Sequence, residues 1–291
     1  MRDKIDKNQK DYFLREQIKA IQSELGEDED DEIREYEAKY PDLIFPLYEE
    51  VNQYQKGKAA EIDFYNYRRA RGKYIAYCEG DDYWTDPLKL QKQVDFMEAN
   101  PEYSVCFHNC YMFDTCKNEY VPRKTLNKDC DIDLDIFLNS HLAIAQPLTM
   151  VFRRNMFSYE WKKYNNHYCD TVEISHLLIE GRGKFMAFYG GQYNLHKGGV
   201  CSSISDVKLS RFATECAREL WDYTRNDYVK KFFLNNMKWC LDLYEHDIRN
   251  KEYRQILWKT ISRDSVLRGT VLKYCVKKIL QKLTKKYLYV K

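Results

Sequence analysis

Hydrophobic positions recur in short blocks along the chain, and their spacing switches between that of helices and that of strands. Helical spacing marks residues 54–70, 86–102 and 169–181, whereas residues 43–47, 73–78, 103–113 and 184–200 are apolar or alternating, as in strands. Beyond residue 205 the spacing is helical to the end. Helices and strands that follow one another in this way predict an α/β sandwich with a largely parallel sheet and a helical C-terminal region.

The segment DPLKLQKQVDFMEANPE, residues 86–102, carries the signals of a helix start. Asp86 is the predicted N-cap, and Pro87 occupies the first turn, where a missing N–H is tolerated. The predicted inward face consists of the apolar residues Leu88, Leu90, Val94, Phe96 and Met97.

Residues 1–31 contain no Pro, and their apolar residues recur at helical spacing among charged ones. Their sequence is MRDKIDKNQKDYFLREQIKAIQSELGEDEDD. This predicts a long N-terminal helix that is closed by Gly26 and suited to coiled-coil self-association. The segment closely resembles the helical stretch of Lon proteases that precedes their ATPase module. No GxxxxGK(S/T) phosphate loop follows and no Ser/Lys peptidase site is recognised, so we expect neither Lon activity.

The composition is that of an ordinary globular protein, with 291 residues of which 44% are hydrophobic and 32% charged. A formal net charge of +2 provides no whole-molecule attraction to nucleic acid, and no apolar run approaches the roughly 20 residues of a membrane-spanning helix. The ten cysteines include no CxxC pair and no signal peptide opens the sequence. We therefore expect reduced thiols and a cytoplasmic location.

An unusual group of carboxylates follows the apolar strand at residues 73–78. Glu79, Asp81 and Asp82 surround Gly80, and three neighbouring carboxylates repel one another unless a cation or hydrogen-bond donors balance them. Carboxylate oxygens suit Mn²⁺ or Mg²⁺, and ligands of α/β sheets bind at the carboxyl ends of strands. The residues alone leave two interpretations open, a metal site and a solvated turn.

Residues 69–109 resemble the family 2 inverting glycosyltransferases of the GT-A fold. Their sequence is RARGKYIAYCEGDDYWTDPLKLQKQVDFMEANPEYSVCFHN. Their pattern A-x-G-x-Y-I-hydrophobic-D/E-x-D-D is matched from Ala70 to Asp82, with Glu79 in place of the commoner Asp. The resemblance implies that Asp81 and Asp82 hold a metal ion, Mn²⁺ or Mg²⁺, together with the ribose or diphosphate of a nucleotide-sugar donor. By the same resemblance, Glu79 supports donor binding.

Two later segments also resemble this family. Asp170 opens the helix in HYCDTVEISHLLIEG, where the family places the general base, although Cys169 stands where Gly is usual. The helix dipole at this position favours an ionised carboxylate, and the alternative is a plain N-cap. QYNLHKGGV resembles the family segment Y-R-x-H-x-G-G-V, which implies His196 as a metal or phosphate ligand and Lys197 as a phosphate contact. Asn194 replaces the family's Arg.

His108 ends the apolar part of the strand at VCFHN, where it either lines the acceptor side or caps the strand. The resemblance spans residues 32–204, so we predict three parts: a Lon-like segment at 1–31, a glycosyltransferase domain at 32–204 and a helical region at 205–291. The first two strands of the family, with their TYN and DDGSTD turns, have no counterpart. The predicted fold is therefore a partial GT-A sandwich.

Two functions from different classes follow. The first is metal-dependent, inverting transfer of a sugar, of the hexosyltransferase type, from a nucleoside-diphosphate sugar to a glycan or lipid-linked acceptor, as in polysaccharide biosynthesis. The second is an inactive, chimeric or truncated glycosyltransferase that serves as a binding or assembly module. A fragment with a Lon function is the least favoured alternative.

The C-terminal tail, residues 265–291, contains eight Lys and Arg and no acidic residue in the sequence SVLRGTVLKYCVKKILQKLTKKYLYVK. Leu272, Cys275, Val276, Ile279, Leu280 and Leu283 recur at helical spacing. This predicts a basic amphipathic helix. It either packs on the core or lies as a peripheral contact on the inner face of the cytoplasmic membrane.

Overall fold

The structure is a computed structural model that describes residues 29–48, 59–122, 124–140, 142, 144–158, 160–164, 167, 169–197, 204–245, 249–261 and 265–288. Contacts divide the chain into two units, Met1–Ala59 and Ala60–Lys291. The first unit contains α2 (Glu29–Lys39). The Tyr48 hydroxyl donates a hydrogen bond of 3.0 Å to the carboxylate of Glu37 in this helix. The long helix predicted for residues 1–31 lies outside the described residues except for the start of α2. The predicted boundaries near residues 31 and 204 remain predictions.

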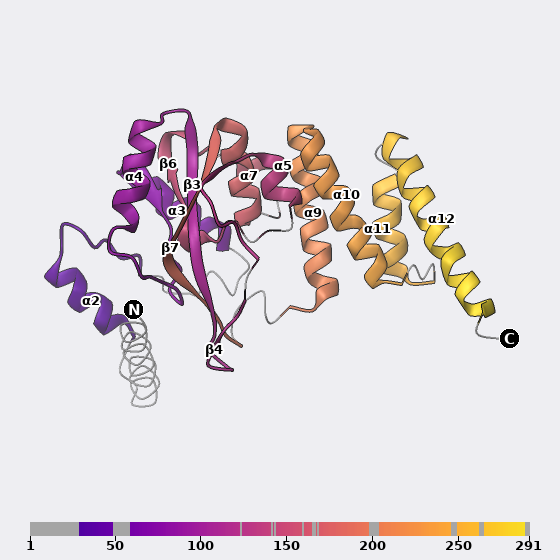
Figure 1. Ribbon diagram of the computed structural model, residues 1–291, viewed down its shortest axis with the longest axis horizontal. Coiled ribbons are helices and arrows are strands. Elements are labelled where there is room, and N and C mark those ends of the chain that lie inside the picture. The colour runs from indigo at the N-terminus through magenta and orange to yellow at the C-terminus, as the bar shows by residue number, and fades with distance from the viewer. Residues whose placement is uncertain are drawn as a thin grey trace. The chain divides into compact units, whose positions relative to one another are not determined.

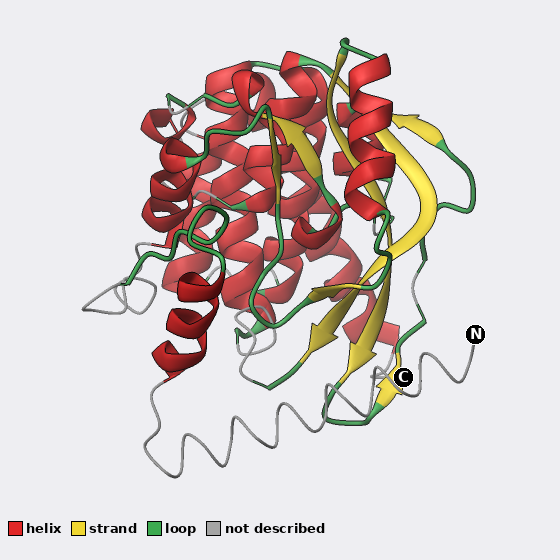
Figure 2. Ribbon diagram, turned by 90° about the vertical axis from the view of Figure 1, so that its left-hand side faces the viewer, coloured by secondary structure: helices red, strands yellow, loops and turns green. Residues whose placement is uncertain are grey.

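In the second unit, the described residues form a mixed sheet of seven strands. They are β1 (Tyr74–Ala76), β2 (Tyr83–Trp84), β3 (Tyr103–Asp114), β4 (Glu119–Tyr120), β5 (Cys130–Ile132), β6 (Val151–Arg153) and β7 (Arg182–Leu195). The main order is β1-β6-β3-β7-β2, with β4 paired to β3 and β5 paired to β7. Figure 2 shows how the two long strands, β3 and β7, curve through the molecule.

The expectation of a largely parallel sheet is wrong in detail. Among the described strands, only β3 and β7 pair in parallel, and the other ladders are antiparallel. The reason is that β6 inserts in the opposite direction between β1 and β3, while the short strands β2, β4 and β5 add antiparallel edges. Because β6 is antiparallel to both neighbours, β1 and β3 still run in the same direction, and their carboxyl ends point the same way.

Helices cover both faces of this sheet. They are α3 (Ala59–Arg69), α4 (Lys89–Ala99), α5 (Leu134–Asn139), α6 (Trp161–Tyr164) and α7 (Asp170–Glu180), with 3-10 turns at Pro147–Thr149 and Arg154–Met156. Alternate residues of β3 enter different cores, because successive side chains of a strand point to opposite faces. Val105 and Phe107 pack with residues of α3 and α7, whereas Cys106 packs with Met97 of α4. The α/β sandwich of a partial GT-A fold is thus confirmed.

The buried face of α4 matches the predicted one only in part: Met97 is buried and Phe96 packs against the core, as expected. Leu88 and Leu90 are exposed, and the buried residues are Lys89, Gln93 and Met97. The Lys89 ammonium lies 4.0 Å from the centre of the Trp84 ring, and Gln93 donates a hydrogen bond to the Thr149 carbonyl. Helix α4 begins at Lys89, so Asp86 accepts from the Leu88 N–H in the turn before it and does not act as the N-cap.

The C-terminal region is helical, as the spacing predicts. It consists of α9 (Asp206–Thr224), α10 (Asp227–Leu243), α11 (Lys251–Ile261) and α12 (Ser265–Leu288), which follow one another away from the sheet in Figure 1. The core of α9 and α10 includes a stacked pair, Trp221 and Phe233, and it continues into α5 through Leu134 and Leu138. No described helix is long and apolar enough to span a membrane.

Candidate functional site

The acidic turn connects the two ends of the strand order. It leaves β1 at Ala76 and reaches β2 at Tyr83, and a backbone hydrogen bond from Asp82 N–H to the Glu79 carbonyl closes it. Gly80 stands open, since a Cβ added there would have no neighbour within 4 Å. The turn therefore has free space beside its carboxylates.

Asp82 points into the protein. Its side chain is 8% exposed, and its Oδ1 accepts a hydrogen bond of 2.9 Å from the backbone N–H of Asn194 in β7. Its Oδ2 is buried and has no hydrogen-bond partner among the described residues. Burial raises the pKa of Asp82 to about 6, and the Asn194 hydrogen bond offsets only part of this effect.

Asp81 points outward and meets the residue that follows β7. Its Oδ2 lies 2.8 Å from His196 Nε2, and both side chains are exposed to solvent. Asn194 Nδ2 also donates a hydrogen bond of 2.6 Å to the Asp81 carbonyl. Residues 81–82 and 194–196, separated by more than 110 positions in sequence, thus form one polar cluster.

Asn194 is a residue whose importance the sequence argument missed. In the family pattern this position is an Arg, whose positive charge Asn194 lacks. In the structure, its backbone N–H and side-chain amide hold both aspartates of the turn. The replacement of the family's Arg by Asn194 marks this position as unusual in the sequence. It does not indicate that Asn194 contacts Asp81 and Asp82.

Glu79, Lys197 and His108, which the sequence also singled out, differ in their surroundings. Glu79 and Lys197 are exposed, one at the start of the turn and the other directly after His196. His108 lies in the middle of β3, so the expectation that it caps the strand is wrong. It is buried, its Nδ1 lies 2.8 Å from the Asn109 carbonyl, and burial lowers its pKa to about 4.

Asp170 is the first residue of α7, and Cys169 occupies the N-cap position. Among the described residues, its carboxylate accepts hydrogen bonds only from Thr171, including one of 2.7 Å from the backbone N–H. Asp170 keeps an exposed surface, yet protein atoms crowd its carboxyl, and this burial raises its pKa.

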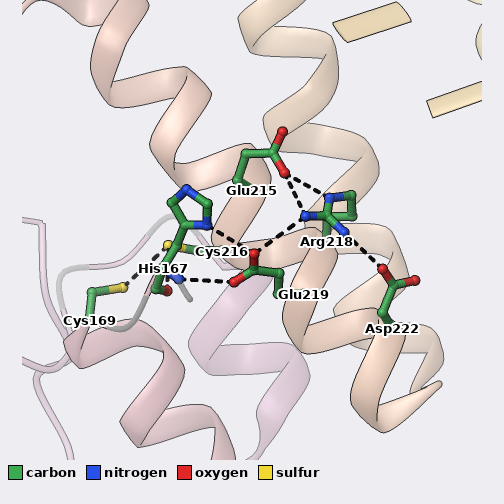
Figure 3. Close-up of polar contacts among 7 residues, drawn as sticks. All are labelled: His167, Cys169, Glu215, Cys216, Arg218, Glu219 and Asp222. Atoms are coloured by element: carbon green, nitrogen blue, oxygen red, sulfur yellow. Dashed lines mark hydrogen bonds and ion pairs between the residues drawn. The ribbon is translucent and has the colours of Figure 1, made fainter. Parts of the chain in front are cut away.

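The segment that leads to Asp170 is anchored by α9 (Figure 3). His167 contacts the Glu219 carboxylate through its backbone N–H, at 2.9 Å, and through Nδ1, at 3.0 Å. Cys216 donates a hydrogen bond to the His167 carbonyl, and its sulfur lies 3.8 Å from that of Cys169. One turn inside α7, the buried carboxylate of Glu173 accepts a hydrogen bond from the Tyr67 hydroxyl. These contacts fix the start of α7 on two sides.

The polar cluster offers few ligands to a divalent cation. The described residues contain no group of three or more His, Cys, Asp or Glu that could hold a metal ion. Asp82 turns toward Asn194, which leaves Asp81 and His196 as an exposed carboxylate and imidazole in contact. The Asp81 carboxylate fits Mn²⁺ or Mg²⁺ when phosphate oxygens supply the other positions, since Mg²⁺ is usually bound by one or two carboxylates plus substrate phosphates.

Comparison with known proteins agrees with the motif. Residues 27–160 match the family model described as glycosyl transferase family 2. This stretch therefore resembles the family 2 glycosyltransferases. An uncharacterised glycosyltransferase of Methanocaldococcus jannaschii is 29% identical over 164 residues, which are 50% of this chain and 52% of that protein.

Two further relatives extend the picture of this glycosyltransferase-like chain. An uncharacterised protein of Mycobacterium tuberculosis is 37% identical over 124 residues, 42% of this chain and 34% of that protein. A Lon protease of Clostridium acetobutylicum is 51% identical over 41 residues, 13% of this chain and 5% of that protein. The chain thus spans about a third of the mycobacterial relative and about half of the archaeal glycosyltransferase.

Proposed function

We propose that the chain is an inverting glycosyltransferase that transfers a sugar from a nucleoside-diphosphate sugar to a glycan or lipid-linked acceptor. The observation that carries this proposal is the contact between the acidic turn and the end of β7, where Asp81 meets His196 and Asp82 meets Asn194. The family resemblance assigns both of these separate segments to the donor. Their contact is what a shared donor site requires.

The proposed donor site combines an ion with charged and polar side chains. Asp81 and His196 are the proposed ligands of Mn²⁺ or Mg²⁺, which would neutralise the diphosphate as it leaves. Lys197 contributes a further positive charge beside them, and Glu79 supports the turn. Asp82, which the sequence suggested as a third metal ligand, holds the turn to β7 through Asn194 in this proposal.

Asp170 is the proposed general base, which removes the proton from the acceptor hydroxyl as its oxygen attacks the anomeric carbon. Its raised pKa supports this role, because a base accepts a proton more readily when its conjugate acid is weaker. The contacts of His167 with α9 and of Glu173 with Tyr67 keep the start of α7 in place. A fixed base lowers the entropic cost of reaching the transition state.

The test is release of nucleoside diphosphate from UDP-hexose and GDP-hexose in the presence of Mn²⁺, with and without added glycans. We expect release by the wild type and a loss of about 100-fold or more in Asp170→Asn. The proposal fails if no donor is consumed and none binds.

A second candidate is an inactive binding or assembly module. It is favoured by β1, which ends the strand order and pairs only with β6 among the described strands. An edge of this kind offers backbone groups to another strand. In this alternative the donor site is incomplete and the chain acts through its partners. Coiled-coil self-association through residues 1–31, which lie outside the described residues except for 29–31, belongs to the same alternative.

We also propose that α12 brings the protein to an anionic membrane surface at the cytoplasmic face, as polysaccharide biosynthesis on a lipid-linked acceptor would need. Leu272, Val276 and Leu280 form an exposed apolar row, while Val271 and Cys275 face the core. Lys273 and Lys277 are exposed beside this row and make no ion pair within the described residues. Apolar and basic side chains on one surface are typical of interfacial helices.

A further inference from the structure

Three tyrosines on β3, β4 and β7 form an exposed aromatic cluster. Tyr111 of β3 and Tyr189 of β7 stack with ring centres 4.6 Å apart, and Tyr120 of β4 meets Tyr111 edge-on at 5.8 Å. Their exposed fractions are 37% for Tyr111, 42% for Tyr120 and 43% for Tyr189. We call these three residues the tyrosine platform.

The platform keeps hydrogen-bonding groups available. The hydroxyls of Tyr111 and Tyr189 make no hydrogen bond to another described residue. Each ring therefore presents an apolar surface beside a polar group that can donate or accept. This combination suits a ligand that is itself apolar on one side and rich in hydroxyls at its rim, as a pyranose ring is.

A chain of hydrogen bonds joins the platform to the acidic turn. The Tyr120 hydroxyl donates to Gln192 Oε1 at 3.3 Å, and Gln192 Nε2 donates to Asn194 Oδ1 at 2.9 Å. Asn194 Nδ2 then donates to the Asp81 carbonyl. Tyr111 stands opposite Gln192 in the parallel ladder, so both side chains lie on the same face of the sheet. The platform is thus continuous with the proposed donor site.

The described charges around Tyr120 are of both signs, with Glu119 before it and the exposed Lys124 after it. The turn between β3 and β4 carries Asp114, Lys117 and Glu119, and Lys117 is paired with Asp114 at 3.3 Å. The carboxylate of Glu119 directly precedes Tyr120 and repels phosphate. Charges of both signs provide no positive excess to hold a nucleoside diphosphate, whereas an uncharged sugar needs none.

We propose that the tyrosine platform binds a sugar ring of a saccharide acceptor, with the ring stacked on Tyr111 or Tyr189. The role as acceptor site rests on the proposed glycosyltransferase function, whereas saccharide binding itself does not. The hydrogen-bond chain through Gln192 and Asn194 couples the platform to the turn that holds the donor.

The test uses ligand-observed saturation-transfer NMR with four neutral trisaccharides: cellotriose, maltotriose, chitotriose and mannotriose. We expect the wild type to bind at least one of them, and Tyr111→Ala and Tyr189→Ala each to weaken that binding by about tenfold. Tyr111→Phe keeps the ring and loses only the hydroxyl, so it should bind more weakly than wild type but more tightly than Tyr111→Ala. Tyr228→Ala, which removes an exposed tyrosine from α10, is the matched control and should bind as wild type does.

Donor titrations of the same proteins separate the two proposals. Tyr111→Ala and Tyr189→Ala should bind UDP-hexose or GDP-hexose as tightly as the wild type, and Asp81→Ala should retain trisaccharide binding. Trisaccharide binding without any donor binding would reject the glycosyltransferase proposal and keep the platform. The platform is rejected if no trisaccharide binds, if the alanine variants bind as wild type does, or if they lose only donor binding.

Discussion

At the residue scale, Asp82 shows how burial and one hydrogen bond compete at a single carboxyl. The Asn194 N–H stabilises the ionised form, but desolvation is the larger effect and the pKa rises to about 6. The sequence motif predicted that Asp81 and Asp82 belong to one turn. It could not show that adjacent carboxylates face opposite ways, because that depends on which one reaches β7.

The raised pKa of Asp82 predicts a defined dependence of stability on pH. The folded protein holds this proton up to about pH 6, whereas the unfolded chain releases it near 3.8. The free energy of unfolding should therefore fall, relative to Asp82→Asn, as pH rises from about 4 to 6. The difference should reach about 1–3 kcal/mol and stay constant above this range. Urea unfolding of both proteins at several pH values measures it, and a gap that is independent of pH would contradict the assignment.

Asp170→Asn should separate turnover from donor binding. The amide cannot accept the acceptor proton, so we expect turnover to fall by about 100-fold or more while the donor dissociation constant changes by less than about threefold. In the wild type, kcat/KM should rise with pH through the pKa of Asp170, which lies above its usual value. Equal losses of turnover and donor affinity would show that Asp170 binds the donor instead.

At the element scale, α4 illustrates a limit of hydrophobic spacing. The pattern predicted the helix and the burial of Met97 correctly, but it missed Lys89 and Gln93, which are buried through contacts with Trp84 and Thr149. Those partners come from β2 and from a 3-10 turn more than 50 residues further along. A polar residue that is buried by such contacts looks like a surface residue in sequence.

Gln93 offers a direct test of that buried face. Gln93→Ala leaves the Thr149 carbonyl without this donor and opens a small cavity, so the free energy of unfolding should fall by about 1–3 kcal/mol. Gln91→Ala removes an exposed glutamine two positions away on the same helix and should change it by less than about 0.5 kcal/mol. Equal effects in denaturant unfolding would mean that Gln93 does not hold α4 to the sheet.

Helix α12 provides a prediction about location. Lys273→Glu combined with Lys277→Glu should reduce co-sedimentation with vesicles of anionic lipid by about tenfold or more, since each lysine near such a surface contributes about 1 kcal/mol. Lys208→Glu combined with Lys251→Glu makes the same charge change on α9 and α11 and should leave most of the binding. The membrane proposal is rejected if both double variants sediment alike.

At the scale of the whole molecule, the sequence predicted the α/β layers and the helical C-terminal region, because long helices and the strands at β3 and β7 have clear periodicity. It did not predict β2, β4 and β5, which are two or three residues long and exist through pairing with distant strands. The polar cluster was predictable from the family motif as far as Asp81 and His196. The contribution of Asn194 and the tyrosine platform depended on the register of β3 and β7.

The most direct test of the central claim is isothermal titration calorimetry of UDP-hexose and GDP-hexose in the presence of Mn²⁺. We expect the wild type to bind one of these donors, Asp81→Ala to weaken this binding by about tenfold or more, and Asp170→Asn to bind as the wild type does. Chelation of Mn²⁺ should weaken donor binding of the wild type and change Asp81→Ala little. If the wild type binds neither donor, or if Asp81→Ala binds as tightly as the wild type, the acidic turn is not the donor site.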